Sequence, residues 1–197
     1  MIDKKIKNKL IEFKKIDGRI SYLRIKSAIA NISLINAYAP TEGAAIEEKE
    51  VFYNKLQESC EKIPKHDTLI VLGDYNAKIG REDFIKDVAG KETIHEITTD
   101  NGMRLCHLAT EMDMYIISTK FKHKKEHKIT WNIPGKNKGN QIDHILIKKN
   151  RERMIDDVRS YRGTSVETDH NLVISKMKLR MVEEKHRQIK KKWDKEN

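Results

Sequence analysis

Four short polar motifs lie beside apolar runs, and their residue types suit metal-assisted attack on a phosphodiester. They are Asn36-Ala37-Tyr38-Ala39-Pro40, Gly73-Asp74-Tyr75-Asn76-Ala77, Gln141-Ile142-Asp143-His144 and Thr168-Asp169-His170-Asn171. Loops at one end of a sheet bring distant positions together, and loops on a rigid scaffold commonly carry chemistry. Carboxylate and amide oxygens suit Mg²⁺ or Mn²⁺, and such a cation relieves negative charge on phosphoryl oxygens and helps an alkoxide to leave. The motifs together therefore indicate a metal-dependent site.

Taken singly, each motif has an ordinary explanation. Asp74 and Asn76 follow an apolar run, so Asp74 could orient or deprotonate a water while Asn76 donates a hydrogen bond, but an Asp-Asn turn explains the same residues. In the Asp169-His170 pair, one side chain could reach a metal and the other a phosphate. An isolated Asp-His pair is more often structural, and only the joint pattern favours a site.

The order of these motifs, together with Thr130-Trp131, resembles the endonuclease/exonuclease/phosphatase superfamily. The resemblance is strongest to the endonuclease domain that precedes reverse transcriptase in non-LTR retrotransposons, and to the craniofacial development protein 2-like products derived from it. It runs from about Leu10 to Met181. Relatives begin with a further stretch that holds an early Asn and a metal-binding Glu, and this chain lacks it.

The resemblance implies roles for particular residues. The implied catalytic residues are Tyr38, Asp74, Asn76, Asp143 and His170. Asp169 and Asp74 would bind the cofactor, Mg²⁺ or Mn²⁺, and Asp143 would hold His170 in its working tautomer so that it can hydrogen-bond a phosphoryl oxygen.

The substrate groove is predicted from an aromatic residue and a basic loop. Trp131 could form one wall, although a tryptophan at a strand end fits a core equally well. The loop from Lys120 to Lys128 offers Lys122, Lys124 and Lys125 to a phosphate backbone, and a solvated charged face explains them about as well. Asn36 is expected to be mainly structural, and three histidines lack persuasive partners, namely His66, His107 and His144.

Composition favours a polyanionic partner. The 197 residues carry a net charge of +10 with a pI near 9.4, and each cation near a phosphate releases condensed counterions. DNA is therefore the expected partner, with RNA as a possible one, although charge alone also fits a basic protein without a specific partner. Hydrophobic residues make up 38%, enough for the core of one domain.

Cysteine usage and hydropathy indicate a reducing compartment. Cys60 and Cys106 show no metal-ligand spacing and are expected to be buried thiols. No apolar run approaches the roughly twenty residues that span a bilayer. We therefore expect no membrane association and a nuclear or cytoplasmic location.

Apolar periodicity predicts an alternation of strands and helices. Strands are expected over 10–16, 19–26, 29–36, 68–72, 114–118, 128–131, 141–148, 157–162 and 172–181, and helices over 44–63 and 101–113. Asp17-Gly18 should join the first two strands through positive backbone angles, and Asp100 or Asn101 should cap the second helix. The run Leu69–Leu72 fits a central strand buried on both faces.

These elements predict an α/β (α+β) fold of the DNase I-like type, a two-sheet β-sandwich with outer helices that lacks its N-terminal strands. Residues 1–182 would form this partial domain and 183–197 a charged tail or linker. The lost strands should expose sheet edges, which favours self-association or pairing with a supplied N-terminal fragment. The missing Glu should weaken metal binding and activity.

Two functions of different classes remain. The first is divalent-metal-dependent phosphodiester hydrolysis by a DNA-nicking endonuclease of retrotransposon origin. The second is a catalytically silent remnant that binds nucleic acid or protein. A phosphatase acting on small molecules or lipids is a weaker third, because the positive charge disfavours it.

Overall fold

The computed structural model describes residues 3–136, 138–162 and 168–179. Its largest element is a six-stranded sheet with the order β1-β2-β3-β4-β8-β5. The strands are β1 (Leu10–Lys15), β2 (Ile20–Ile25), β3 (Ile32–Tyr38), β4 (Thr68–Asp74), β5 (Met114–Ile116) and β8 (Asp143–Lys148). Neighbours pair antiparallel except β3 and β4, which are parallel. The sheet places the ends of β3 and β4 beside the start of β8.

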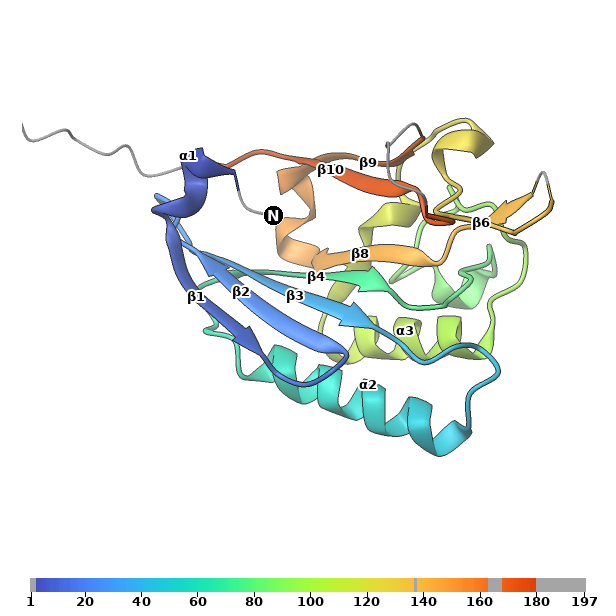
Figure 1. Ribbon diagram of the computed structural model, residues 1–197, viewed down its shortest axis with the longest axis horizontal. Helices are drawn as coiled ribbons and strands as arrows, with labels where there is room; N and C mark the ends of the chain where they lie inside the picture. The colour runs from blue at the N-terminus through green and yellow to red at the C-terminus, as the bar shows by residue number, and fades with distance from the viewer. Residues whose placement is uncertain (1–2, 137, 163–167, 180–197) are drawn as a thin grey trace, which may run out of the picture.

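The parallel pair requires a crossover connection, and a helix provides it. Helix α2 (Ile46–Glu61) links β3 to β4, and α3 (Asp100–Glu111) packs beside it on the same face of the sheet (Figure 1). Their apolar residues, among them Leu56 and Leu105, meet Ile35 and Val71 of the sheet in the main core. As predicted, β4 is central in the sheet and Leu69–Val71 are buried, but Leu72, the last residue of the predicted buried run, is only half-buried.

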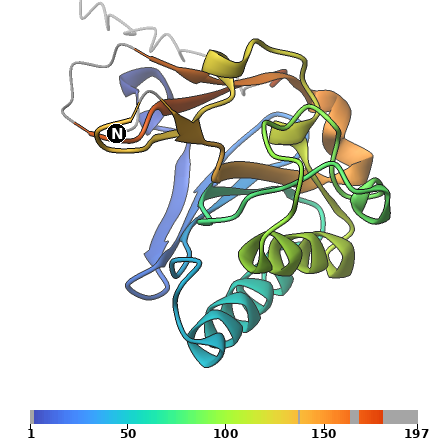
Figure 2. The same ribbon diagram turned by 90° about the vertical axis from the view of Figure 1, so that its right-hand side faces the viewer.

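The opposite face of the sheet is covered by two antiparallel strands, β9 (Ile155–Tyr161) and β10 (Leu172–Met177) (Figure 2). A second core joins Ile155 and Val158 of β9 to Ile70 and Ile147 of the large sheet. The predicted α/β fold with two strand layers and outer helices is therefore confirmed. The second layer contains these two strands within the described part of the chain.

Short elements complete the fold. Strands β6 (Trp131–Asn132) and β7 (Gly139–Asn140) form a small hairpin near the start of β10. A short helix α1 (Lys4–Lys7) precedes β1. The 3₁₀ helices are η1 (Asp83–Ile85), η2 (Ile117–Thr119), η3 (Lys125–His127) and η4 (Lys149–Met154).

The first turn forms by a different mechanism from the one predicted. Asp17 and Gly18 both lie outside the positive-φ region. Instead, one carboxylate oxygen of Asp17 accepts hydrogen bonds from the backbone N–H groups of Arg19 and Ile20, at 2.6 and 2.7 Å. The hairpin itself is as predicted, but a side-chain acceptor stabilises its turn.

Several predicted boundaries are wrong for identifiable reasons. The strand that contains Asn36 starts at Ile32, because Ile29 is 75% exposed and has no core to face. The segment before Trp131 is not a strand, since the amides of Lys128 and Ile129 donate back to Lys125. The strand expected from Met114 ends at Ile116 and gives way to η2.

Helix α3 is capped by Thr99, whose side chain accepts a hydrogen bond from the N–H of Gly102. The predicted caps, Asp100 and Asn101, are instead the first two residues of the helix. Strand β9 begins two residues earlier than expected and ends at Tyr161. Strand β10 ends at Met177, and the last two residues of the predicted strand lie outside the described residues.

Both cysteines are free and buried, as expected. Desolvation by burial raises the pKa of each thiol to about 12, so neither is a reactive thiolate. Within the described residues, no helix is both long enough and apolar enough to cross a membrane.

Candidate metal-dependent active site

Two carboxylates meet where β4 ends and β8 begins. Asp74 is the last residue of β4 and Asp143 the first of β8, and the two are direct partners in the antiparallel ladder. Side chains of direct cross-strand partners project from the same face of a sheet. The ladder alone therefore places two acidic groups side by side.

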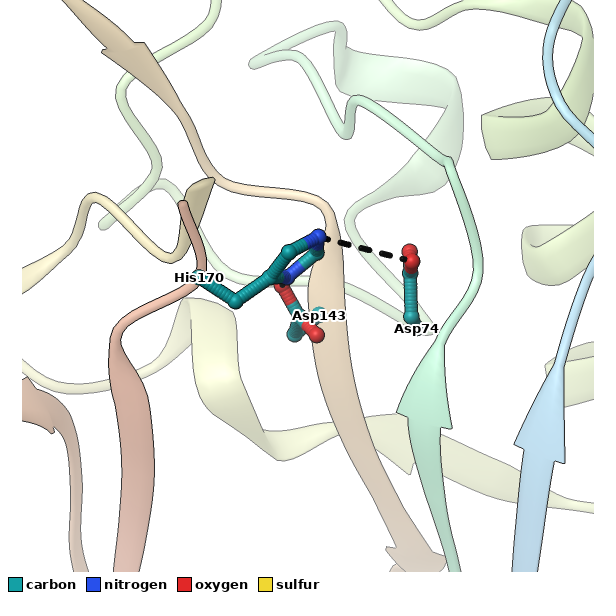
Figure 3. Close-up of side chains that lie close together, drawn as sticks. All are labelled: Asp74, Asp143 and His170. Carbon is teal, nitrogen blue, oxygen red and sulfur yellow. Dashed lines mark hydrogen bonds and ion pairs between the residues drawn. The ribbon is translucent and has the colours of Figure 1, made fainter. Parts of the chain in front are cut away.

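His170 joins them from the segment that precedes β10 (Figure 3). One ligand atom from each of Asp74, Asp143 and His170 lies within 4.8 Å of the others. His170 Nδ1 is 3.2 Å from Asp143 Oδ2, and Nε2 is 3.9 Å from Asp74 Oδ2. The imidazole thus donates Nδ1–H to Asp143 and directs Nε2 toward Asp74, the tautomer that the resemblance implies.

Backbone pairing holds the histidine segment in place. The N–H of Asn132 donates to Asp169 O at 2.7 Å, and the N–H of Asn171 donates to Thr130 O at the same distance. The Asn171 side chain also donates to Ile129 O at 3.0 Å. Strand β6 and the two residues before it therefore anchor the residues on both sides of His170.

Burial makes this cluster electrostatically costly. The pKa of Asp143 is raised to about 6, because desolvation by burial and the negative charge of Asp74 outweigh the hydrogen bonds from Thr130 and His170. Desolvation also raises the pKa of Asp74, and nearby Asp169 adds to this effect. Because carboxylates in this position repel one another, a bound cation or a protonated imidazole would relieve the repulsion.

Asn76 has an unusual backbone and an occupied side chain. Its φ of 48° is in the left-handed region, which asparagine tolerates better than most residues. Its N–H donates to Asp74 Oδ1 at 2.9 Å, and its side-chain amide donates to Ala39 O at 3.1 Å. Asn76 therefore ties the first two sequence motifs together, and its predicted hydrogen bond to substrate stays a prediction.

Tyr38 lies beside the carboxylates. It is the last residue of β3, is the direct partner of Asp74 in the parallel ladder, and is 50% exposed. Asn36, two residues earlier, is also exposed. The strand end predicted for Tyr38 is thus observed, with the side chain available to solvent.

A cavity of about 550 Å³ opens at the cluster. Asp143, His170 and Thr168 line its polar part, while Leu72 and Ile145 of the sheet and Val173 of β10 line the rest. A mostly apolar hollow with convergent polar groups at one end is the usual form of a ligand site.

No family model matches the chain. Curated relatives include craniofacial development protein 2 from Bos taurus and from Tragulus javanicus, each 28% identical over 181 residues and 92% of this chain. The alignment covers 30% and 31% of those proteins, so the chain spans about three tenths of the length of the relatives it matches.

Solved structures share its fold at low identity. The 3′ phosphatase NExo from Neisseria bound to a product DNA hairpin has a TM-score of 0.60 and 19% identity over 84% of this chain and 66% of its own. The endonuclease domain of TRAS1, a telomere-specific non-LTR retrotransposon, has a TM-score of 0.56 and 18% identity, over 82% of this chain and 64% of its own. The AP endonuclease LMAP from Leishmania major has a TM-score of 0.58 and 17% identity, over 85% of this chain and 56% of its own.

The chain therefore shares the fold of these solved nuclease structures. In this fold the candidate site lies at one end of the large sheet, where β3, β4 and β8 meet the segment before β10. Of the residues predicted from sequence, the fold brings Tyr38, Asp74, Asp143 and His170 together at this edge.

Asp169 lies next to the three-residue cluster and outside it. Its carboxylate is exposed and accepts a hydrogen bond from Trp131 Nε1 at 2.7 Å, which lowers its pKa. The negative charge of Asp169 raises the pKa of Asp74. The two predicted metal ligands, Asp74 and Asp169, thus lie near each other, and their role as ligands stays a prediction. The half-buried Trp131 borders the site through the same hydrogen bond.

The basic loop packs against β9. His123 contacts Asp157 at 2.6 Å, and the ends of the loop form ion pairs, Lys120 with Glu152 and Lys128 with Glu92. Between those ends, the side chains of Lys122, Lys124 and Lys125 are exposed. They are available to a polyanion, and their predicted role in the groove stays a prediction.

Sequence reasoning missed His144, which was expected to lack partners. The side chain is fully buried: Nε2 donates to Ala77 O at 2.9 Å, and Nδ1 accepts from the Ser118 hydroxyl at 2.9 Å. Burial lowers its pKa to about 4, so the ring is neutral. His144 therefore fastens the loop after β4 to β8 directly behind Asp143. His66 also has a partner, Asp67, at 3.3 Å.

Thr130 was predicted only as part of a motif, and Asn101 only as a possible helix cap, but both support the site. The Thr130 hydroxyl accepts from the N–H groups of Ile142 and Asp143, at 2.9 and 3.1 Å. The Asn101 side chain donates to Pro40 O at 3.0 Å and to Asn76 O at 3.4 Å. Both residues position the loops that carry the site. The Asn101-Gly102 dipeptide at the start of a predicted helix was the available signal, but the sequence did not reveal its long-range partners.

Proposed function

We propose that the chain hydrolyses phosphodiester bonds with a divalent cation and nicks DNA. The observation that carries this proposal is the juxtaposition of Asp74, Asp143 and His170 within 4.8 Å at the edge of a nuclease-like fold. The net charge of +10 supports a nucleic-acid substrate. The motif order supports a retrotransposon origin.

The donor set fits a hard cation. Asp74 and Asp169 would hold Mg²⁺ or Mn²⁺. Burial of Asp74 and the neighbouring charge of Asp169 both raise the pKa of Asp74, and a bound cation would stabilise its charged form. When bound, the cation would supply charge relief at the phosphoryl oxygens and the leaving oxygen. Manganese is the better candidate if His170 also binds, because imidazole suits transition metals better than magnesium.

The protein groups supply orientation and proton transfer. Asp74 orients a water and accepts its proton, a task that suits a carboxylate whose pKa is raised by burial. Asp143 fixes Nδ1–H of His170, and the protonated ring donates Nε2–H to a phosphoryl oxygen as negative charge develops. Tyr38 and Asn76 add hydrogen bonds to the same phosphate.

The test is nicking of supercoiled plasmid by the purified chain with Mg²⁺ or Mn²⁺. Asp74→Ala and His170→Ala proteins, prepared identically, serve as paired variants, and Asp87→Ala is the matched control because Asp87 is an exposed carboxylate in the turn after η1. We expect wild type and the control to nick and both site variants to be inactive. Equal nicking by all four proteins would reveal a contaminating nuclease.

A second candidate function is nucleic-acid binding without cleavage. Two observations favour it: the Asn76 side chain is already bonded to Ala39, and the Asp169 carboxylate to Trp131. In that case a folded wild-type chain binds DNA and leaves the plasmid intact with either metal. RNA binding belongs to the same proposal and is tested by competition with unlabelled RNA.

We also propose that exposed sheet edges allow the chain to self-associate, and that it works in the nucleus or cytoplasm. Strand β1 pairs with β2 alone, and β10 with β9 alone, among the described residues. Unpaired strand edges recruit further strands.

A further inference from the structure

The end of the large sheet carries a continuous row of polar side chains. Asp143, Asp74 and Tyr38 are direct partners across β8, β4 and β3. The row continues to Arg19, which directly precedes β2. Ile20 pairs with Ala37, and the N–H of Tyr38 donates to the carbonyl of Arg19 at 2.9 Å, so Arg19 lies opposite Tyr38. Direct partners project from the same face, so a cation, a phenol and two carboxylates stand in one line.

Arg19 is held on this row by three contacts. Its guanidinium lies 5.4 Å from the centre of the Tyr38 ring, within the range of a cation–π interaction. One terminal nitrogen donates to Glu48 at 2.9 Å and the other to the Tyr38 carbonyl at 3.4 Å. The side chain remains 39% exposed, so part of the guanidinium still faces solvent.

We propose that Arg19, stacked on Tyr38, forms a second phosphate-binding subsite for the phosphate that flanks the one at Asp74 and His170. Neighbouring strands are about 4.8 Å apart, which puts the Arg19 backbone about two strand spacings from Asp74. The long side chain gives the guanidinium the reach to meet the next phosphate of a strand lying along the row. A guanidinium presents five N–H donors in a planar fork that matches phosphate oxygens.

The Glu48 carboxylate competes with a substrate phosphate for the Arg19 guanidinium. In the free protein the Glu48 carboxylate holds the guanidinium, and a phosphate must share or replace that contact. Exposed ion pairs contribute little to stability, so exchanging one anion for another is inexpensive. The substrate strand would then run from Trp131, past His170, to Arg19. This inference deepens the proposed function and rests on it for the position of the cleaved phosphate.

Binding to a fluorescent DNA duplex in EDTA tests the subsite without cleavage. The matched control is the exposed ion pair of Lys62 with Glu58, which lies at the other end of α2 from Glu48. Arg19→Gln and Lys62→Gln remove the same charge, as do Glu48→Gln and Glu58→Gln. Circular dichroism verifies the fold of each protein.

We expect Arg19→Gln to weaken binding and to reduce the slope of log Kd against log salt by about 0.9, the value for one lost phosphate contact on duplex DNA. Lys62→Gln should leave that slope nearly unchanged. Glu48→Gln should tighten binding more than Glu58→Gln, and this advantage should disappear in the Arg19→Gln background. Tyr38→Phe should keep the slope of wild type because the aromatic ring remains.

Equal slopes for Arg19→Gln and Lys62→Gln would overturn the subsite, and so would a complete lack of DNA binding. Cleavage is assayed separately with Mg²⁺ or Mn²⁺. A salt slope that depends on Arg19, without cleavage, would support the subsite and refute the proposed hydrolysis. Cleavage without any effect of Arg19 on binding would support hydrolysis and refute the subsite.

Discussion

At the residue scale, the chemistry depends on the pairing of Asp143 with His170. The hydrogen bond at 3.2 Å selects the tautomer that directs Nε2 toward Asp74. Asp143→Asn keeps the shape of the side chain and removes its charge, so a protonated imidazole loses one of two stabilising carboxylates. We expect the nicking rate to fall by about a hundredfold or more, the usual size of a general acid–base contribution.

Plasmid nicking measured at saturating DNA checks this prediction, with Kd for DNA measured in EDTA. An Asp143→Asn protein that nicks at the wild-type rate would show that Asp143 has no part in orienting His170. A change confined to Kd would assign Asp143 to binding instead.

A second residue-scale prediction concerns Asp67, far from the site. Its buried carboxylate accepts from Arg24 Nε at 2.7 Å and from the Ser33 hydroxyl at 2.7 Å. Desolvation by burial opposes ionisation, but these hydrogen bonds outweigh it and lower the pKa of Asp67 below its ordinary value. A carboxyl with a lowered folded-state pKa stabilises the fold above its unfolded pKa, near 4, and loses that contribution as pH falls through the folded value.

Asp67→Asn should therefore lower the free energy of unfolding by about 2 kcal/mol at pH 7, a typical value for hydrogen bonds to a charged group. The difference from wild type should shrink as pH falls below about 4. Urea denaturation at pH 7 and below pH 4 measures the free energy of unfolding of each protein. Asp113→Asn is the control, because the Asp113 side chain is 72% exposed. A difference that is independent of pH would contradict the assigned ionisation.

At the element scale, the β3–β4 pair depends on a glycine. Gly73 has φ of 146°, and a Cβ built there would lie 1.9 Å from the carbonyl oxygen of Ala37. Gly73→Ala must push the two strands apart next to Asp74, so we expect it to destabilise the fold by about 3 kcal/mol or more. Gly18→Ala, where a Cβ meets nothing within 4 Å, should change stability by less than about 0.5 kcal/mol. Thermal denaturation of both variants decides the matter; similar melting temperatures would refute the close approach.

Helix α3 supplies the second element-scale prediction. Asn101 at its start is fully buried and donates to Pro40 O and Asn76 O, so it links the loops after β3 and β4. Asn101→Ala leaves both carbonyls without this partner, and we expect a loss of about 2 kcal/mol. Its effect on nicking should vanish in an Asn76→Ala background if it acts through Asn76. Additive effects on nicking would show that Asn101 acts by another route.

At the scale of the whole molecule, apolar side chains remain on the surface of both strand layers. Phe13 of β1 is 66% exposed, Leu172 of β10 is 51% and Ile174 is 40%. Strand β10 also has one edge without a partner among the described residues. Together these features predict association of the chain at high protein concentration.

Ile174→Lys should shift the sedimentation coefficient at high concentration toward that of the monomer, because a lysine on an edge strand discourages pairing. Ile97→Lys is the matched control, since Ile97 is 76% exposed on a loop away from the sheet edges. The same shift in both variants would indicate that charge, and not the β10 edge, controls association.

Local sequence patterns determined much of this protein. Apolar runs located the large-sheet strands, both long helices and the central position of β4, because burial and backbone periodicity act over a few residues. The order of the polar motifs predicted Tyr38, Asp74, Asp143 and His170 as site residues, and the fold brings these four together. The assignment of residues 1–182 to one domain stays a prediction, and 183–197 lie outside the described residues.

Tertiary structure decided what depends on partners far along the chain. The burial of His144 between Ala77 and Ser118 and the anchoring of the β8 start by Thr130 follow from hydrogen-bond geometry that periodicity does not encode. The row from Arg19 to Asp143 exists only because strands distant in sequence pair in one register. Short-range propensities specify elements, whereas cross-strand pairing specifies which side chains become neighbours, and the candidate site depends on those neighbours.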